Sequence, residues 1–453
     1  MRSYRGSLTE LLEEWKLTDN PFWADYQILG PMFSALRIFL GMDDVLPVIV
    51  GSKGCAIHLR FSLIAWGEED FDLGKRPISV LEYPLDKIVV GDYQITTAWI
   101  EKMKKLVEIR KPRLIVLMPT DPLTLSGTDM AGIANEVNTS LEVETTFLSI
   151  SAISGANQWV GYDAALRALY QPLMGKKYAK RNAVNLVGWM WPSRRRTHEI
   201  GACIDMLKTL GIEVASIISG GSSLKDIENS MEAKANAMVC AALAGDLLHE
   251  LEEHGMKLAG RRSPYGFSGT TEWLEDIGQA LDMDIKDQIR QLALLYESQF
   301  QANKEILRGK KVFVSGGPGR LIGLLHTMLD YEVDIQAAAL FWPHPWSHQD
   351  LLHMFEEHDL KLKEFIVSPS LYDLEEIAGK YEIDVWMGGY QEQHTCKAHG
   401  IPFVPITVYT VPHVGFEGAV NLGNKLIMAL NGYSFTEDVF NAKEIEPCIH
   451  RQQ

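Results

Sequence analysis

The sequence lacks the cysteine pattern of a disulfide-bonded or zinc-binding scaffold. Its 453 residues include five cysteines, none in C-x-x-C spacing, at positions 55, 203, 240, 396 and 448. An odd, dispersed set of thiols does not build a disulfide framework, and it is typical of a reducing compartment. Cys203 and Cys240 lie within the apolar runs EIGACIDML and ANAMVCAALA. We expect both to be small buried hydrophobic residues.

Long hydrophobic runs and excess positive charge are also absent. No apolar run reaches the 18 or so residues that a membrane-spanning helix needs, and no apolar signal segment stands near the N-terminus. The formal net charge is −16, whereas a nucleic-acid-binding surface needs clustered lysine and arginine. The basic run Arg194-Arg195-Arg196 is too short to reverse this. We therefore expect a cytoplasmic protein that binds neither membranes nor nucleic acid.

What the sequence does contain is a repeated pattern, a β-rich run that enters a glycine loop. Three runs share it: 45–55, 183–188 and 311–319. Further β-rich runs, 113–120 and 383–389, are separated from their neighbours by helix-length segments. Strands that alternate with helices predict parallel sheets with right-handed crossovers. The fold class predicted is therefore α/β, with Rossmann-like, doubly wound parallel sheets.

The chain is too long for one hydrophobic core, because such cores stop growing at about 250–300 residues. The three repeats predict three α/β domains: 1–182, 183–308, and 309–453 with a C-terminal tail. The stretch 224–308 is rich in Ala, Glu, Leu and Lys and is predicted to be mostly helical. Ligands of parallel sheets gather at the carboxyl ends of the strands. The loops after Val50, Gly188 and Val314 are therefore the places to search for chemistry.

The third repeat carries two candidate ligand loops. The loop 316–320 (GGPGR) fits neither phosphate-binding glycine motif, so a plain strand-to-helix turn is expected, with Arg320 directing a cation into any cleft. The loop FWPHPWSH follows the next strand and contains Trp342, His344 and Trp346. These side chains either line a pocket for a flat ligand or form a rigid loop packed on a neighbouring domain or subunit. The sequence leaves both alternatives open.

Two further motifs favour the less specific interpretation. His394-x-Cys396-x-x-His399 has metal-ligating residue types, but it is predicted to lie on a short crossover helix that spreads the three side chains over different faces. We do not expect a metal site there. The run 193–199 (SRRRTHE) is either an anion- or partner-docking surface or a solvated helix start.

Seven segments, taken together and in order, resemble the nitrogenase component 1 family, which includes the paired large subunits of nitrogenase and of the chlorophyllide and dark protochlorophyllide reductases. The segments are 29–37, 48–61 (VIVGSKGCAIHLRF), 153–166, 184–192, 263–278, 312–328 and 400–422. The second and third domains look most like the chlorophyllide reductase Y subunit. The GSKGC neighbourhood looks most like a nitrogenase β subunit. The fold expected from the resemblance is that of component 1 subunits.

The resemblance implies an iron–sulfur cluster, either 4Fe–4S or P-cluster-like, shared with a partner subunit. Cys55 matches the cysteine of the family's glycine loop, and Gly51 and Gly54 would let the backbone approach a bulky cluster. The family's other two thiol positions depart, with no cysteine between residues 26 and 30 and with Thr120 and Asp121 after the strand 113–119. Asp121 is a weak candidate for an oxygen ligand. Cys55 is thus one ligand of a shared site or, alternatively, a structural thiol.

The resemblance also implies a function. The chain would be an oxidoreductase subunit, active only in a complex with a homologous component 1 subunit, as an α2β2-like heterotetramer or a homodimer. A separate iron–sulfur reductase, not this chain, would bind ATP and deliver electrons to reduce a small molecule, tetrapyrrole-like or otherwise. The substrate-cleft candidates are Arg320, Trp342, His344, Trp346 and His413.

One departure qualifies that function. The family's catalytic-cofactor histidine has its approximate counterpart near Thr407, and no histidine stands there. A nitrogenase-type catalytic cofactor is therefore not expected on this chain. The alternative function is a cofactor-assembly scaffold or binding protein without turnover.

Overall fold

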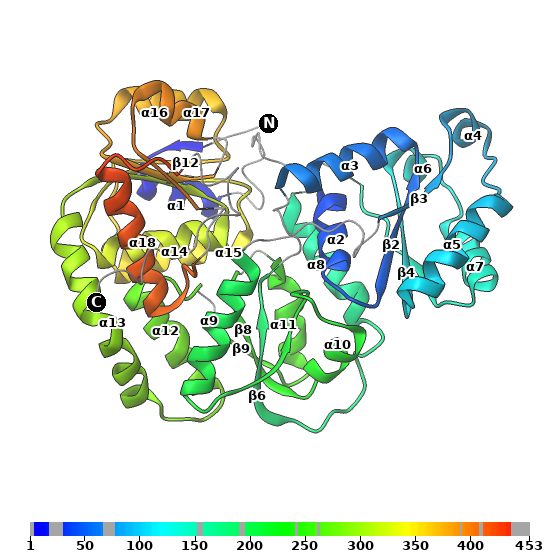
Figure 1. Cartoon of the computed structure of the whole chain (residues 1–453), viewed down its shortest axis with the longest axis horizontal. Helices are drawn as coiled ribbons and strands as arrows, with labels where there is room; N and C mark the ends of the chain where they lie inside the picture. The colour runs from blue at the N-terminus through cyan, green and yellow to red at the C-terminus, as the bar shows by residue number, and fades with distance from the viewer. Residues whose placement is uncertain are drawn as a thin grey trace.

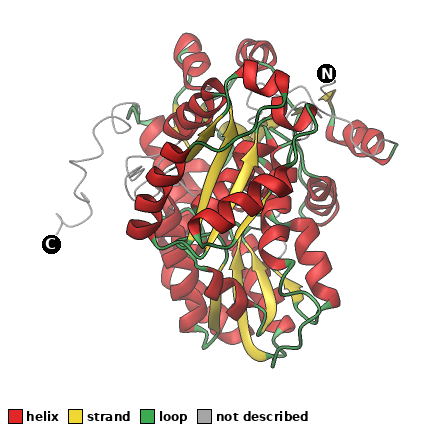
Figure 2. Cartoon of the chain, turned by 90° about the vertical axis from the view of Figure 1, so that its right-hand side faces the viewer, coloured by secondary structure: helices red, strands yellow, loops and turns green. Residues whose placement is uncertain are grey.

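The computed structural model describes residues 4–17, 30–66, 78–151, 157–189, 195–240, 243–260, 263–389, 392–406 and 411–435. Among these residues three β-sheets form the framework, and helices cover their faces (Figures 1 and 2). Several residues discussed above lie outside the described residues: Tyr26, Ser193, Arg194, Thr407 and Cys448. Among the described helices, none is both long enough and apolar enough to span a membrane.

The first sheet has the strand order β3-β2-β4-β5, and all of its strands are parallel. Its two central strands, VLPVIVG and LIVLMP, are buried along their whole length, as a parallel strand covered on both faces requires. The strands are β2 (Val45–Gly51), β3 (Ser79–Glu82), β4 (Leu114–Pro119) and β5 (Thr145–Phe147). The helices are α2 (Pro31–Leu40), α3 (Lys53–Trp66), α4 (Leu85–Val90), α5 (Thr97–Arg110), α6 (Asp121–Leu125), α7 (Met130–Leu141) and α8 (Gln158–Tyr170). We call residues 30–170 the first unit.

The second sheet has the order β7-β6-β8-β9 and is also parallel. Its strands are β6 (Arg181–Val187), β7 (Glu213–Ile217), β8 (Ala233–Met238) and β9 (Lys257–Ala259). The helices are α9 (Arg195–Thr209), α10 (Leu224–Ser230) and α11 (Gly245–Glu253). We call residues 181–259 the second unit.

The prediction that residues 224–308 are mostly helical is confirmed, but it missed the strands β8 and β9. The β8 sequence AKANAM is rich in alanine, a strong helix former, yet it pairs with β6 on one side and β9 on the other. Its small side chains fit a strand buried on both faces, so sheet pairing overrides local propensity. The described helices of the stretch are α10, α11, α12 (Gly266–Ala280) and α13 (Lys286–Leu307).

The third sheet has the order β1-β12-β11-β10-β13-β14. Its strands are β1 (Tyr4–Gly6), β10 (Lys311–Gly316), β11 (Asp334–Leu340), β12 (Glu364–Val367), β13 (Val385–Gly388) and β14 (Phe403–Pro405). Its helices are α1 (Leu8–Lys16), α14 (Pro318–Asp330), α15 (Pro345–Glu357), α16 (Leu371–Lys380), α17 (Gln393–His399) and α18 (Gly415–Leu430). We call these elements the third unit.

The N-terminal segment belongs to the third unit, not to the domain 1–182 in which the sequence placed it. The strand β1 pairs antiparallel with β12, and the Arg5 guanidinium forms ion pairs with Glu364 and Glu376. A three-residue strand has no readable hydrophobic period, so its partner could not be predicted. The otherwise parallel third sheet therefore ends in one antiparallel edge strand.

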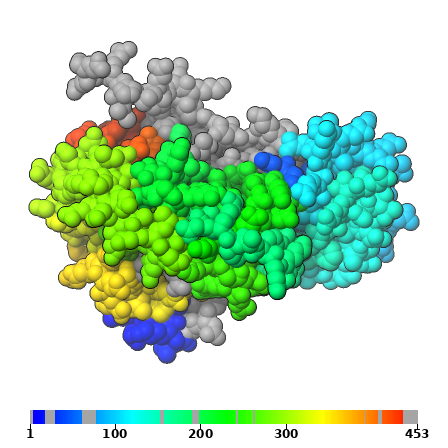
Figure 3. All heavy atoms as spheres, turned by 90° about the horizontal axis from the view of Figure 1, so that it is seen from below, coloured from blue at the N-terminus to red at the C-terminus, as the bar shows by residue number. Residues whose placement is uncertain are grey.

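The second unit lies between the other two (Figures 1 and 3). One apolar core is shared by the second and third sheets and includes Val184 of β6 and Val312 of β10. Another joins α2 and α8 of the first unit to the second sheet, through Val187 and Met238. The residues that follow β8 and β10 also meet, at Cys240 and Gly319, so the carboxyl ends of the second and third sheets face one shared junction.

Candidate functional site

The glycine turn after β2 presents Cys55 on the first turn of α3. The Cys55 side chain is half-buried, and its Sγ accepts a hydrogen bond from Ser52 Oγ at 3.3 Å. Gly51 has a φ of 149°, which side-chain-bearing residues rarely adopt, and a Cβ there would lie 1.9 Å from Thr120 Oγ1. Gly54 is exposed, and a Cβ there would meet no atom within 4 Å. The surface of α3 next to Cys55 is therefore exposed at Gly54.

Thr120 and Asp121 lie at the same edge of the first sheet as this turn. The strands β2 and β4 are neighbours, and the Thr120 amide donates to the Val50 carbonyl at 2.8 Å. Thr120 is 2% exposed, and its buried Oγ1 has no hydrogen-bond partner among the described residues. Asp121 begins α6 and is half-buried. The structure thus brings Gly51 and Thr120 into contact, while metal ligation by Cys55 or Asp121 stays a prediction.

The loop after β11 is tightly folded. Trp342 has a φ of 37° and covers Gly317, where a Cβ would lie 2.6 Å from the indole Cζ2. His344 is the N-cap of α15, and its Nδ1 accepts from the Trp346 amide at 3.1 Å. His344 is 2% exposed, and burial lowers its pKa to about 3. The imidazole is therefore neutral at physiological pH.

This loop packs on the other two units. The His344 ring meets Trp159 of α8 edge-on, with centroids 4.8 Å apart. The Trp346 ring lies against His249 of α11, with centroids 4.4 Å apart. Of the two alternatives left open by the sequence, these contacts favour a rigid loop that joins neighbouring units. A role for these side chains in a substrate cleft stays a prediction.

At the junction of the second and third sheets, Cys240 meets the start of α14. Cys240 follows β8 and is half-buried, and a Cβ on Gly319 would lie 2.7 Å from its Sγ. The next residue of α14, Arg320, is half-buried, and its Nε is a buried atom without a hydrogen-bond partner among the described residues. The structure thus places a thiol and a guanidinium-bearing residue at one junction. We expected Cys240 to be a small buried hydrophobic residue, but it is only half-buried, because its alanine-rich run forms β8 and the loop after it.

The first unit adds buried polar groups to this junction. The Arg37 guanidinium is 8% exposed, and its Nη1 donates to the Tyr162 hydroxyl at 3.4 Å. Burial raises the pKa of Tyr162, although the Arg37 guanidinium and the Ser34 hydroxyl partly offset this. In the third unit, His413, which the sequence analysis predicted to line a substrate cleft, is 1% exposed, and its backbone lies against Gly418 of α18. Sequence analysis missed Arg37 and Tyr162, because no motif marks them.

A buried acid lies at the carboxyl ends of β10 and β13. Glu392 is fully buried, and its Oε1 accepts from Ser315 Oγ at 2.8 Å, while the Trp386 indole donates to the same hydroxyl at 3.1 Å. Burial raises the pKa of Glu392 and so favours its neutral form. Its sequence context, GGYQEQ, contains no signal that predicts burial.

The His394, Cys396 and His399 side chains do not converge. They lie on α17, where Cys396 is buried, His394 is exposed, and His399 Nε2 pairs with Glu375 Oε2 at 2.9 Å. The expectation of side chains spread over different faces therefore holds. Of the run 193–199, the helix α9 begins at Arg195, and His198 is exposed while Glu199 is buried.

Three α/β units, with a thiol-bearing glycine turn at one sheet edge and buried polar groups at another, define a multidomain α/β protein. The sequence model of the nitrogenase component 1 type oxidoreductases matches residues 30–431. The chain therefore belongs to the nitrogenase component 1 type oxidoreductase family, as the motifs predicted.

Relatives extend over most of the chain. It is 23% identical over 431 residues to the nitrogenase molybdenum-iron protein alpha chain of Methanothermobacter marburgensis. That alignment covers 88% of this chain and 87% of the relative. It is 22% identical over 452 residues to the nitrogenase vanadium-iron protein beta chain of Trichormus variabilis, covering 89% and 94%. The nitrogenase iron-molybdenum cofactor biosynthesis protein NifE of Sinorhizobium fredii matches half of this chain, 50%, at 24% identity.

A solved structure, nitrogenase Cp1 at pH 6.5, has the same fold. Its TM-score is 0.72 with 16% identity, and the alignment covers 95% of this chain and 93% of that one. The predicted family and fold class are confirmed. The finer likeness to the chlorophyllide reductase Y subunit stays a prediction.

Proposed function

We propose that this chain is a subunit of a nitrogenase-like reductase complex and that Cys55 supplies one ligand to an iron–sulfur cluster shared with a homologous subunit. The complex would reduce a small molecule with electrons from a separate, ATP-dependent iron–sulfur reductase. Family membership supports the oxidoreductase class. Relatives named as alpha and beta chains support a paired, heterotetramer-like assembly.

The donors around Cys55 fit one ligand position, not a whole cluster. A four-iron cluster takes four ligands, normally thiolates. Cys55 supplies the one thiol at this edge, because Thr120 and Gly30 occupy the family's other two ligand regions. A second chain must supply the remaining ligands.

The observation that carries the proposal is the open surface around this thiol. Cys55 is half-buried, yet Lys53, Gly54 and His58 beside it on α3 are exposed. Ile57, on the same helix, is 44% exposed, which suits an apolar contact with another chain.

The chain's own residues prepare this edge for an anionic group. The first turn of α3 directs backbone amides outward, and the helix N-terminus favours negative charge. Gly54 is exposed, so the surface next to Cys55 would be accessible to another chain. A bound cluster would supply one-electron transfer at low potential.

The substrate region we propose is the junction at Arg320 and Cys240. The Arg320 Nε is buried without a hydrogen-bond partner among the described residues, so an anionic or electron-rich substrate group would satisfy it. As the family resemblance implies, ATP would be bound by the separate reductase; the loop 316–320 of this chain fits neither phosphate-binding motif.

The test is a pair of cysteine variants in the anaerobically purified complex. Cys55→Ser should lower iron and sulfide per chain and reduce turnover. The matched control is Cys203→Ala, which removes a thiol from the apolar core, where Cys203 is 0% exposed, and should leave the iron content unchanged. Iron and turnover that survive Cys55→Ser would refute the proposal.

A second candidate function is cofactor assembly. The similarity to the biosynthesis protein NifE favours it, together with the two missing thiols. Steady-state turnover by the reconstituted complex, with ATP and reductant, separates the two candidates. Sustained reduction of any substrate excludes a scaffold that only holds a cofactor, whereas release of a loaded cofactor without turnover supports it.

A further inference from the structure

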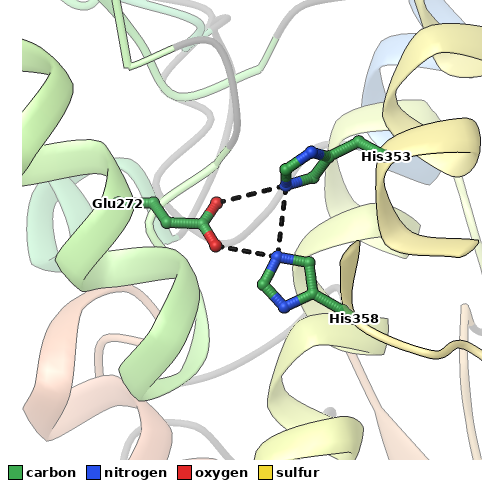
Figure 4. Close-up of side chains that lie close together, drawn as sticks. All are labelled: Glu272, His353 and His358. Atoms are coloured by element: carbon green, nitrogen blue, oxygen red, sulfur yellow. Dashed lines mark hydrogen bonds and ion pairs between the residues drawn. The ribbon is translucent and has the colours of Figure 1, made fainter. Parts of the chain in front are cut away.

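Outside these sites, a carboxylate and two imidazoles converge between two helices. Glu272 lies on α12, His353 on α15, and His358 caps the C-terminus of α15 (Figure 4). The three donor atoms all lie within 4.8 Å of one another, and among the described residues no other group of three such side chains does so. Such a convergence calls for a physical reason.

The separations suit a shared metal ion. His358 Nε2 lies 2.8 Å from Glu272 Oε1, His353 Nε2 lies 3.6 Å from Glu272 Oε2, and the two Nε2 atoms are 3.1 Å apart. A tetrahedral ion with bonds of about 2.0–2.1 Å holds neighbouring donors about 3.3–3.4 Å apart. Because the two distances from Glu272 run to different carboxylate oxygens, one oxygen must turn toward both rings, and the donors must shift by about 0.5 Å, to reach that spacing.

The surroundings orient both rings. His353 Nδ1 lies 3.1 Å from Glu357 Oε1, so a proton on Nδ1 is held by the carboxylate and the Nε2 lone pair faces the cluster. The His358 ring packs edge-on against the buried His326 ring, with centroids 4.8 Å apart. A carboxylate behind a ligating histidine is the usual outer partner in metal sites.

The electrostatics favour a cation at this point. With neutral imidazoles, the Glu272 carboxylate and the His353 lone pair both direct electron density toward the centre. If His358 Nε2 carries a proton, that N–H donates to Glu272, its nearer acceptor. The lone pair of His353 Nε2 then lies 3.1 Å from the same His358 nitrogen, whose proton is already used. A divalent ion would satisfy all three donors at once.

The site is also accessible. The side chains of His353, His358 and Glu272 are 12%, 22% and 26% exposed. Three protein donors leave the fourth tetrahedral position open to water, as in catalytic zinc sites built from two histidines and one glutamate. The same donor set also binds iron(II) with open positions.

We propose that Glu272, His353 and His358 bind one divalent first-row transition-metal ion, such as Zn²⁺, with a coordination position open to solvent. The ion would join α12 to the C-terminal end of α15. This site is independent of Cys55 and of the reductase function proposed above.

The experiment is equilibrium dialysis of the full-length protein, in its anaerobic complex, against buffered Zn²⁺ after chelator treatment, with zinc, iron and sulfide measured per chain. Wild type should hold one zinc that His353→Ala, His358→Ala and Glu272→Gln each lose. Glu357→Gln should weaken zinc affinity by about 10- to 100-fold, because it removes the group that orients His353. Iron and sulfide should be the same in all of these proteins.

The matched control is His399→Ala, because His399 also pairs with a glutamate, Glu375, at 2.9 Å but belongs to no group of three metal-ligating side chains among the described residues. It should keep the zinc. Thermal unfolding supplies a second measurement: Zn²⁺ should raise the midpoint of wild type and His399→Ala but not of the ligand variants. Equal zinc in wild type and the ligand variants, or no zinc in wild type, would overturn the proposal.

Discussion

The turn after β2 and the loop after β11 both follow buried parallel strands, but their side chains have different surroundings. After β2, the turn leaves the Cys55 thiol half-buried beside Gly54, where an added Cβ would meet no atom within 4 Å. After β11, Trp342 and His344 fill the space and contact other units. The first edge is suited to receive a second chain, whereas the second holds this chain's own units together.

The largest effect is expected from straining the buried glycine turn that carries Cys55. Gly51→Ala should destabilise the chain by at least about 2 kcal/mol, because φ is 149° and the new Cβ would lie 1.9 Å from Thr120 Oγ1. The control is Gly54→Ala, which meets nothing and should change stability by no more than about 1 kcal/mol. Chemical denaturation measures both, and equal effects would mean that the turn is not constrained as described.

The next effect is the pH dependence of stability that comes from His344 in the loop after β11. Because burial lowers the pKa of His344 to about 3, the folded state resists a proton that the unfolded chain accepts below about pH 6.5. Stability due to the neutral ring is therefore complete above about pH 6.5 and falls as the pH drops toward 3. At pH 5.5 the loss is about 1.4 kcal/mol.

Replacing the histidine should remove this acid loss. His344→Gln should lower stability at pH 7.5 yet lose about 1.4 kcal/mol less than wild type between pH 7.5 and pH 5.5. The control is the exposed His394→Gln, which should keep the wild-type pH profile. Parallel profiles for wild type and His344→Gln would contradict the buried, neutral imidazole.

The smallest effect concerns the N-terminal segment, which packs against the loop after β11. Trp15 of α1 stacks on His348, and Arg5 of β1 pairs with Glu364. Burial alone would raise the pKa of Glu364, but hydrogen bonds from Arg5, Lys380 and Tyr381 together lower it. Arg5→Ala should cost about 1 kcal/mol above pH 5, because Glu364 keeps its other two partners.

Since a lowered carboxyl pKa stabilises only while the group is ionised, the cost of Arg5→Ala should shrink as the pH falls through the acid range. Lys361→Ala is the control, because its pair with Asp359 is exposed at both ends and should contribute almost nothing. Similar costs for the two variants would show that β1 is not held by its ion pairs.

The sequence predicted those elements whose local pattern agrees with their tertiary environment. The runs 45–51 and 311–316 are continuous and β-rich, and they form the central buried strands β2 and β10. The alanine-rich β8 was missed because its helix propensity conflicts with its place in the sheet. The pairing of β1 with β12 was missed because more than 350 residues separate the partners Tyr4 and Val367.

The same distinction applies to the sites. Cys55 and Thr120 could be placed at one edge, because carboxyl ends of neighbouring parallel strands lie together. Glu272 and His353 stand 81 residues apart on helices whose packing no motif encodes, so their convergence could be found only in three dimensions. Conversely, His394 and His399 are close in sequence but point to different surroundings.

The most direct test of cluster ligation by Cys55 is anomalous diffraction at the iron edge from crystals of the anaerobically purified complex. We predict an iron peak within bonding distance of the Cys55 sulfur, at a boundary with a second polypeptide that supplies the other ligands. A sulfur surrounded by protein atoms of this chain, with no iron peak beside it, would contradict the role assigned to Cys55.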